Sequence, residues 1–305
     1  MNFLKKELIV GISTKTHKML WGKSGNRCAM PECGIELVMD ITETDDETLI
    51  GEECHIIAKK SDGPRGNKFF DISKLNLYEN LILMCRNHHK VIDDNPDLYT
   101  IEKLKLIKKE HEKWVQSQLT SDDKEKLKVD LIYTTYIDEW VKLCDLDNWH
   151  NWTSWLMSAD GPSIYVETLN SLEKLKIYLF TRIWPNEYIE LENAFTNFMK
   201  VLEDLLNQFS KHRIERNDMF YTEKFHKLQW HEQSIYDKLF NEYMFHFYLV
   251  QDLTVELTRS ANYICSLIRK YIDYKFRLEE GYLYFESGPF MDMSFKKYRV
   301  SYSND

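Results

Sequence analysis

The chain of 305 residues has no run of about 18 uninterrupted apolar residues, which is the length that a membrane-spanning helix requires. An apolar stretch near its start, residues 3–12, is interrupted by Lys5, Lys6 and Glu7. It therefore does not resemble the apolar region of a signal peptide. These absences predict a soluble, cytoplasmic protein without a membrane partner.

Cysteine is also scarce, with six in the whole chain. Six cysteines could form three disulfides in a secreted protein, but without an export signal, Cys and His at short spacing more often bind metal. The cysteines gather early in the chain, and a long cysteine-poor stretch follows. Because the chain is long enough for two moderate cores, this distribution favours two domains.

Positive charge is not in excess, since the chain has 40 Lys and Arg but 49 Asp and Glu, and its net charge is -9. Residues 1–120 hold 18 basic and 19 acidic side chains, which leaves 22 and 30 for the remainder. A nearly neutral front part can still present a basic surface, because phosphate binding depends on where cations cluster. One such cluster comprises Lys59, Lys60, Arg65 and Lys68.

The order of apolar runs and turn residues predicts a mixed first domain. Residues 49–58 and 81–84 have the composition of strands, and a Gly-Pro loop at 63–66 lies between them. Residues 101–119 have the apolar spacing of an amphipathic helix. The charge-rich segment 122–128 is interpreted as a linker.

The remainder has the pattern of successive amphipathic helices. The predicted fold class is therefore α+β, with a small mixed domain over residues 1–122 and an all-α domain over residues 123–305. Trp149, Trp152 and Leu156 fall at helical spacing in the second domain. They could form a stacking surface for bases, but we expect a buried core, because amphipathic helices bury such stripes.

Two short pairs in the first domain have the spacing of metal ligands. Cys28 and Cys33 are separated by four residues, and Cys85 and His88 by two. A tetrahedral structural zinc site needs four such sulfur and nitrogen ligands. The alternative is that they are ordinary buried cysteines and a surface histidine. We expect zinc, because two chelating pairs in a domain with a thin core would supply stability that the core lacks.

Three segments resemble the HNH endonuclease family, and they are residues 52–58 (EECHIIA), 63–65 (GPR) and 79–89 (ENLILMCRNHH). The resemblance extends over about residues 20–115, roughly a third of the chain. It implies a zinc-stabilised ββα-metal nuclease domain that cleaves DNA. The family is named after a set of His, Asn and His, and His55, Asn80 and His89 stand at these three positions. His88 stands where many members have a zinc-binding cysteine, and it remains a legitimate ligand.

The chemistry of phosphodiester hydrolysis suits these residue types. The attacking water must lose a proton, while negative charge builds on the phosphoryl oxygens. The resemblance implies His55 as the general base and His89 as a ligand of a hard divalent ion, with magnesium expected. Asn80 would either fix the long loop against the first strand or supply a further oxygen ligand.

One position departs from the family's pattern. Members often have an acidic residue or a histidine directly before the base, and Cys54 stands there. A soft thiol is a poor ligand for magnesium. Because side chains alternate along a strand, Glu53 shares a face with His55 and is the closer candidate for an oxygen ligand. The alternative is that His89, Asn80 and water complete the site.

Three basic residues near the base are candidate DNA contacts, namely Lys59, Lys60 and Arg65. Arg65 lies on the Gly-Pro loop, and a guanidinium there could clamp a phosphate. An exposed loop arginine without a role is the equally weighted alternative.

The helical half is expected to control when and where the nuclease acts, by self-association or through a partner protein. This layout is similar to bacterial defence nucleases that join an HNH domain to a second, sensing domain. Two other interpretations stay open. The protein could be a zinc-dependent nucleic-acid-binding protein without activity, or a nuclease subunit whose helical half docks on a partner ATPase or sensor.

Overall fold

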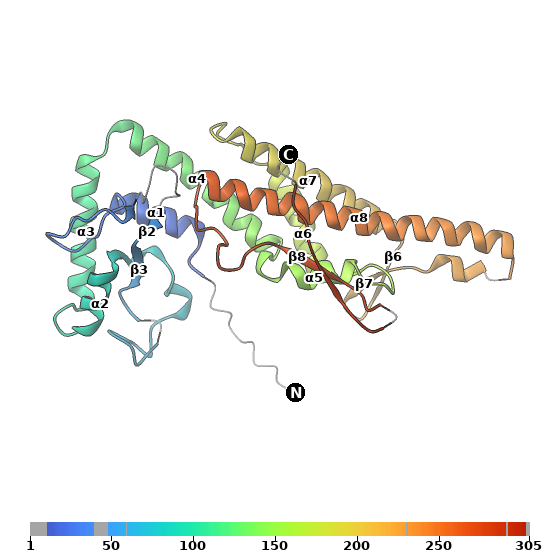
Figure 1. Cartoon of the computed structure of the whole chain (residues 1–305), viewed down its shortest axis with the longest axis horizontal. Coiled ribbons are helices and arrows are strands. Elements are labelled where there is room, and N and C mark those ends of the chain that lie inside the picture. The colour runs from blue at the N-terminus through green and yellow to red at the C-terminus, as the bar shows by residue number, and fades with distance from the viewer. Residues whose placement is uncertain (1–10, 40–47, 59, 230, 291, 303–305) are drawn as a thin grey trace. The chain divides into compact units, whose positions relative to one another are not determined.

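A computed structural model describes the following residues: 11–39, 48–58, 60–229, 231–290 and 292–302. The chain divides into two compact units, Met1–Asp138 and Glu139–Asp305. The division falls inside one helix, α4 (Ser121–Leu143) (Figure 1). The predicted domain boundary at residues 122 and 123 lies in the first turn of this same helix.

The predicted linker, residues 122–128, belongs to α4 and is not a loop, so that interpretation was wrong. Thr120 and Asp123 form a reciprocal cap, in which each side-chain oxygen accepts from the other's backbone N–H at 3.1 and 3.2 Å. Leu127 packs so closely on α1 that a Cβ added at Gly22 would lie 2.5 Å from it. The charged first turns of α4 have the same composition as a linker. Only the cap at Thr120 and Asp123 and the packing of Leu127 show that this segment is helical.

The remaining helices of the first unit are α1 (Thr14–Ser24), α2 (Arg86–Asp94) and α3 (Ile101–Gln118), with short 3-10 turns η1 (Ile72–Lys74) and η2 (Tyr78–Asn80). Its strands are β1 (Val38–Met39), β2 (Thr48–Leu49), β3 (Gly51–His55) and β4 (Leu81–Cys85). β1 pairs with β2 and β3 pairs with β4, both antiparallel. The predicted order of strand, long loop, strand and helix is confirmed.

β4 forms the centre of the first unit. All five of its residues are buried, because β3 pairs with it along one edge and α1, α2 and α3 pack against it. The core around β4 includes Leu20, Leu37, Ile56, Ile92 and Leu104, all without solvent exposure. This small core positions the two ends of β4, where the candidate functional residues lie.

The second unit is mainly helical. After α4, its helices are η3 (Leu146–Asn148), α5 (Trp149–Leu156), α6 (Val166–Phe180), α7 (Ile189–Ser210), η4 (Phe225–Gln229) and α8 (Gln233–Tyr271). The stripe of Trp149, Trp152 and Leu156 is buried, which confirms the core interpretation over a stacking surface. Among the described residues, no helix has both the length and the apolar character that crossing a membrane demands.

The second unit also holds strands, so the prediction of an all-α domain was wrong in this respect. Its strands are β5 (Ser163–Tyr165), β6 (Arg213–Arg216), β7 (Met219–Thr222), β8 (Tyr284–Ser287) and β9 (Lys296–Arg299). They form a three-stranded sheet in the order β5-β7-β6 and a separate β8-β9 pair. Strands of three or four residues, some of them strongly charged, are too short to show alternation in the sequence.

Candidate functional site

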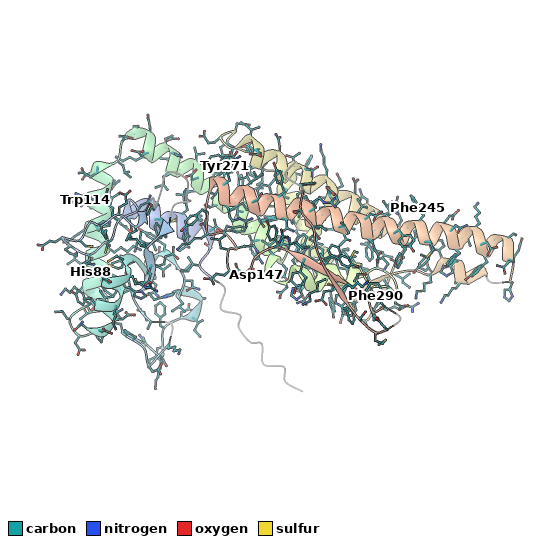
Figure 2. All side chains as sticks on the ribbon, viewed as in Figure 1. His88, Trp114, Asp147, Phe245, Tyr271 and Phe290 are labelled. Atoms are coloured by element: carbon teal, nitrogen blue, oxygen red, sulfur yellow. The ribbon has the colours of Figure 1, made fainter. Side chains whose placement is uncertain are left out.

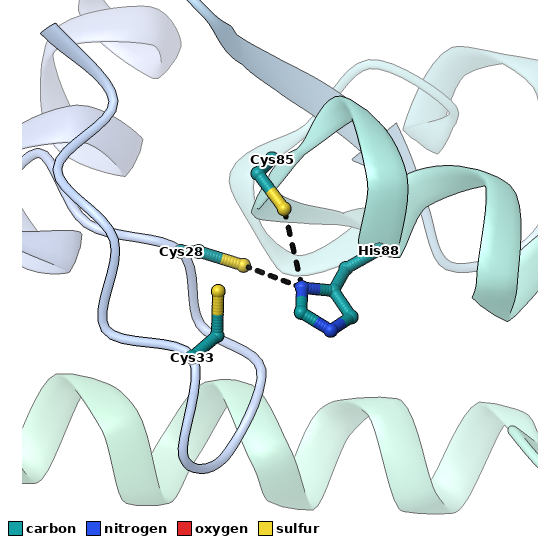
Figure 3. Close-up of side chains that lie close together, drawn as sticks. All are labelled: Cys28, Cys33, Cys85 and His88. Carbon is teal, nitrogen blue, oxygen red and sulfur yellow. Dashed lines mark hydrogen bonds between the residues drawn. The ribbon is translucent and has the colours of Figure 1, made fainter.

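The four predicted zinc ligands lie together in the first unit. Cys28 and Cys33 are in the loop after α1, Cys85 ends β4, and His88 is in the first turn of α2. Their donor atoms all lie within 4.8 Å of one another, and His88 Nδ1 is 3.6 Å from Cys28 Sγ and 3.1 Å from Cys85 Sγ (Figure 3). Tetrahedral zinc, with bonds of about 2.0–2.3 Å, holds its ligands roughly 3.5 Å apart. This Cys3His cluster could therefore hold a zinc ion.

Backbone hydrogen bonds bring the two halves of the cluster together. The N–H of Cys28 donates to Ile35 O at 3.0 Å, which closes the cysteine loop, and the N–H of Ala29 donates to Leu83 O of β4 at 3.0 Å. Burial raises the pKa of the Cys28 thiol to about 12. A metal ion that binds here must displace protons, so its affinity falls as the pH is lowered.

His55 ends β3, opposite Leu81 of β4. Its Nε2 lies 2.9 Å from Oδ1 of Asn76, in the loop between η1 and η2. Because an amide oxygen can only accept, this contact favours the tautomer of the neutral ring that has its proton on Nε2 and a lone pair on Nδ1. The imidazole is thus held in a form that can take a proton at Nδ1. No motif spacing marked Asn76 in the sequence.

Asn80 lies at the end of the long loop and is buried. Its Oδ1 accepts from the N–H of Ile57 at 3.0 Å, and its Nδ2 donates to Ile57 O at 3.2 Å and to Leu75 O at 2.9 Å. The amide therefore ties the loop to the residues that follow β3. This arrangement favours the loop-fixing role over the role of an oxygen ligand.

His89 lies in α2 between two carboxylates. Its Nδ1 is 2.5 Å from Oε2 of Glu52 in β3, and its Nε2 is 3.3 Å from Oδ2 of Asp93, one turn later in α2. Arg86 Nε lies 3.6 Å from the other oxygen of Glu52. The side chains of His89, Glu52 and Asp93 are each about one-third exposed to solvent. One imidazole and two carboxylates therefore meet where solvent can reach them.

A comparison with known protein families gives a match to the part of the chain that contains His55, Asn80 and His89. Residues 33–95 match the HNH endonuclease family model. The matched segment contains β3, β4 and α2, with His55, Asn80 and His89. The C-terminal half has no family match, and a comparison with curated proteins found no match for the chain. The first unit thus contains a segment that matches the HNH endonuclease family.

Glu53, which was predicted as an oxygen ligand of the divalent ion, contacts α1. Its Oε1 accepts from Nε1 of Trp21 at 2.9 Å and lies 2.5 Å from Nδ1 of His17, both in α1. The predicted alternation of side chains along β3 is present, but the face of the strand that carries Glu53 packs against α1. The carboxylate that reaches His89 is Glu52.

Cys54, directly before His55, shares the strand face of Glu52 and is fully buried. Its Sγ donates to Glu52 O at 3.4 Å, and burial raises the pKa of the thiol far above its usual value. A buried neutral thiol is a poor ligand for a hard ion, so Glu52 is the better candidate. The sequence did contain two signals that the prediction missed, since Glu52 lies two residues before Cys54 and Asp93 four residues after His89.

The candidate DNA contacts differ in their surroundings. Lys60 is exposed, whereas Lys59 lies outside the described residues. The side chain of Arg65 is only 3% exposed and bonds to Ile56, Ile92 and Asp93 within the protein. The structure does not favour a phosphate clamp at Arg65, because each of its three guanidinium nitrogens already donates to an acceptor within the protein and little of the side chain reaches solvent.

Replacing Cys33 by Ser should remove one ligand of the Cys3His cluster. Apparent zinc binding in small zinc modules amounts to about 10–16 kcal/mol, so an incomplete site should cost several kcal/mol of metal-coupled folding energy. We expect less than one zinc ion per chain and a lower unfolding temperature, measured by elemental analysis and calorimetry. Cys265→Ser, at a buried cysteine of the second unit, is the control and should keep its zinc. A folded, zinc-free wild-type protein would contradict the assignment.

Proposed function

We propose that the protein is a metal-dependent endonuclease that hydrolyses phosphodiester bonds in DNA, with His55 as the general base. The geometry of His55 carries the proposal, because Asn76 Oδ1 orients the ring and leaves Nδ1 as the acceptor. The family match of residues 33–95 supports the same activity.

The reaction needs a proton acceptor next to the attacking water. As the water oxygen bonds to phosphorus, its proton passes to Nδ1 of His55, and the bond from phosphorus to the leaving oxygen breaks. The imidazolium that forms is stabilised through its Nε2–H, which donates to Asn76 Oδ1. Asn80 holds the loop behind this strand end, so the ring keeps its direction during turnover.

His89, Glu52 and Asp93 are proposed as ligands of a hard divalent ion such as magnesium, although Glu52 lies against Nδ1 of the ring and Asp93 against Nε2, so their donor atoms are not gathered around one point. Carboxylate oxygens are the ligands that magnesium prefers, and an imidazole nitrogen can accompany them. When bound, such an ion would offset the negative charge that develops on the phosphoryl oxygens. Asp93 lies one turn from His89, so α2 presents both side chains on the same side.

DNA as the substrate is supported by the family match. Lys60 and Lys68, near the residues that follow β3, are exposed and can contact phosphates. Lys59 is proposed for the same role from its position in the sequence. The acidic excess of the chain lies after residue 120, where it would repel a phosphate backbone.

The helical unit is proposed to assemble or restrain the nuclease instead of sharing in the chemistry. Among its described residues, no group of His, Cys, Asp and Glu has the spacing of a metal site. α8 instead presents exposed aromatic side chains, including Phe245, which is 69% exposed (Figure 2). The role in bacterial defence rests only on the similar domain layout and stays a prediction.

A zinc-dependent binding protein without activity is the alternative function. It would use the same Cys3His cluster and the same basic residues but would leave His55 without a role. Incubating plasmid DNA with the purified protein, with and without magnesium and chelator, separates the two. Cleavage that requires the divalent ion supports the nuclease, whereas retention of uncut DNA supports the alternative.

Replacing His55 by Ala should abolish most cleavage while the protein stays folded and keeps zinc. Loss of a general base typically lowers the rate by about 10²–10⁴-fold. The measurement is the rate of plasmid cleavage in magnesium. His111→Ala is the matched control, because His111 is a histidine of the same unit whose Nε2 bonds only to a backbone oxygen, that of Ser24. Full activity of a folded His55→Ala protein would place the base elsewhere.

Two neighbouring glutamates allow a direct test of the ion site. Glu52→Gln should weaken the binding of Mn²⁺, measured by electron paramagnetic resonance, and should lower cleavage. Glu53→Gln should leave Mn²⁺ binding near the wild-type value, because Glu53 bonds to His17 and Trp21 on the other face of β3. The reverse result would restore the original assignment of Glu53.

If α8 mediates self-association, the protein should have a mass above the 36.7 kDa of one chain in light scattering. A charge at the exposed Phe245 should then reduce that mass, because a desolvated carboxylate opposes an apolar contact. Phe245→Glu is therefore expected to give monomers, with Phe180→Glu at another exposed phenylalanine as the control. A wild-type protein of one-chain mass at all concentrations would leave a partner protein as the only proposed ligand of α8.

A further inference from the structure

Arg65 is a buried arginine on a surface loop, and all three of its donor groups are engaged. Its Nε donates to Ile56 O at 2.9 Å, its Nη1 to Ile92 O at 2.6 Å and its Nη2 to Asp93 Oδ1 at 2.7 Å. Burying a charge is costly unless it is paired and hydrogen-bonded, and here both conditions are met. The side chain is therefore a rigid bridge between parts of the first unit.

The two ends of this bridge are the two halves of the candidate active site. Ile56 follows His55 directly, at the end of β3. Ile92 and Asp93 are in the last turn of α2, where carbonyl groups lack helical partners and the helix end favours a cation. The guanidinium thus joins the strand that carries the base to the helix that carries His89.

Asp93 extends the bridge to the imidazole of His89. One of its oxygens, Oδ1, accepts from Arg65, and the other, Oδ2, lies 3.3 Å from Nε2 of His89. Because the first bond fixes the carboxylate plane, it also fixes the direction of the oxygen that faces His89. A continuous chain of contacts therefore runs from Ile56 through Arg65 and Asp93 to His89.

The backbone of the loop that carries Arg65 holds this side chain in its buried position. Arg65 has a left-handed backbone, with φ 57°, and the N–H groups of Gly63 and Gly66 donate to Lys60 O and Gly63 O at 3.0 and 2.9 Å. A Cβ at Gly66 would lie 2.4 Å from the backbone oxygen of Ser61, so only glycine fits there. A tight loop of this kind gives Arg65 little freedom to turn toward a phosphate.

We propose that Arg65 is a positioning residue that sets the separation and orientation of His55 relative to His89. This inference rests on the proposed nuclease function. The base must meet the water while the ion site meets the phosphate, and a misplacement of about 1 Å can cost roughly 10²-fold in rate. Lysine cannot replace the guanidinium, because a single ammonium does not span three acceptors in a planar fork.

The test is Arg65→Lys in the full chain, with supercoiled plasmid DNA and magnesium. We expect kcat to fall by about 10²-fold while KM and zinc content stay near the wild-type values. Arg277→Lys is the matched control. Arg277 also has a left-handed backbone and a largely buried guanidinium, with Nη1 2.7 Å from Asp147 Oδ1, but it belongs to the second unit. Its kcat should remain unchanged.

A rise in KM, with a DNA-binding salt dependence reduced by about one phosphate contact, would overturn the proposal in favour of a phosphate clamp. Unchanged kcat in a folded Arg65→Lys protein would overturn it too. Arg65→Gln serves as a second variant. If neither variant folds with zinc bound, Arg65 is a stability residue and the positioning role is lost.

A spectroscopic measurement separates failure of this inference from failure of the proposed function. The ring nitrogen resonances of His55 and His89, assigned from the His55→Ala and His89→Ala proteins, should both shift in Arg65→Lys. They should shift even if the wild-type protein cleaves no DNA, which would disprove the nuclease function alone. Unshifted resonances in both rings would disprove the positioning role whatever the activity.

Discussion

The antiparallel pairing of β3 with β4 is the constraint on which the candidate site depends. Its register sets His55 opposite Leu81 and Gly51 opposite Cys85. Because side chains alternate across a strand, this ladder sends Glu52 and Cys54 toward α2 and sends Glu53 and His55 to the other face. A shift of one residue would exchange the two sets and would separate the acid from His89.

The same ladder places polar groups at both ends of one short, fully buried strand. Cys85, at the end of β4, belongs to the Cys3His cluster, whereas Asn80, just before its start, ties down the loop near His55. So small a core cannot hold both ends rigid by apolar burial alone. The buried Asn80 amide at one end and the Arg65 bridge to α2 supply directional bonds where packing is thin, and the Cys3His cluster at the other end could add metal ligation.

The two parts of the chain differ in their charge. The first 120 residues are nearly neutral and contain the segment that matches the HNH endonuclease family, whereas the acidic excess lies in the rest. Helices with buried aromatic stripes and exposed side chains such as Phe245 are suited to protein contacts. The proposed division, with chemistry in the first unit and assembly or control in the second, rests on this contrast.

Some features of this protein could be predicted from its sequence because they depend on residues that are close together in the chain. The spacings of Cys28, Cys33, Cys85 and His88 predicted one cluster, and the four side chains do lie together. The apolar periods predicted β3, β4 and α3. The spacing of Trp149 and Trp152 predicted a buried stripe.

Other features were decided only by the tertiary structure. Alternation along β3 shows that Glu52 and Glu53 point in opposite directions, but not which of them meets His89, because that depends on where α1 and α2 pack. The exposure of Arg65 likewise depends on Asp93 and two carbonyl oxygens that are distant in sequence. In the second unit, β5 pairs with β7, which is distant in the sequence, whereas β6–β7 and β8–β9 are local hairpins. Local patterns therefore determined the ligands and the elements, while long-range packing determined which side chains face one another.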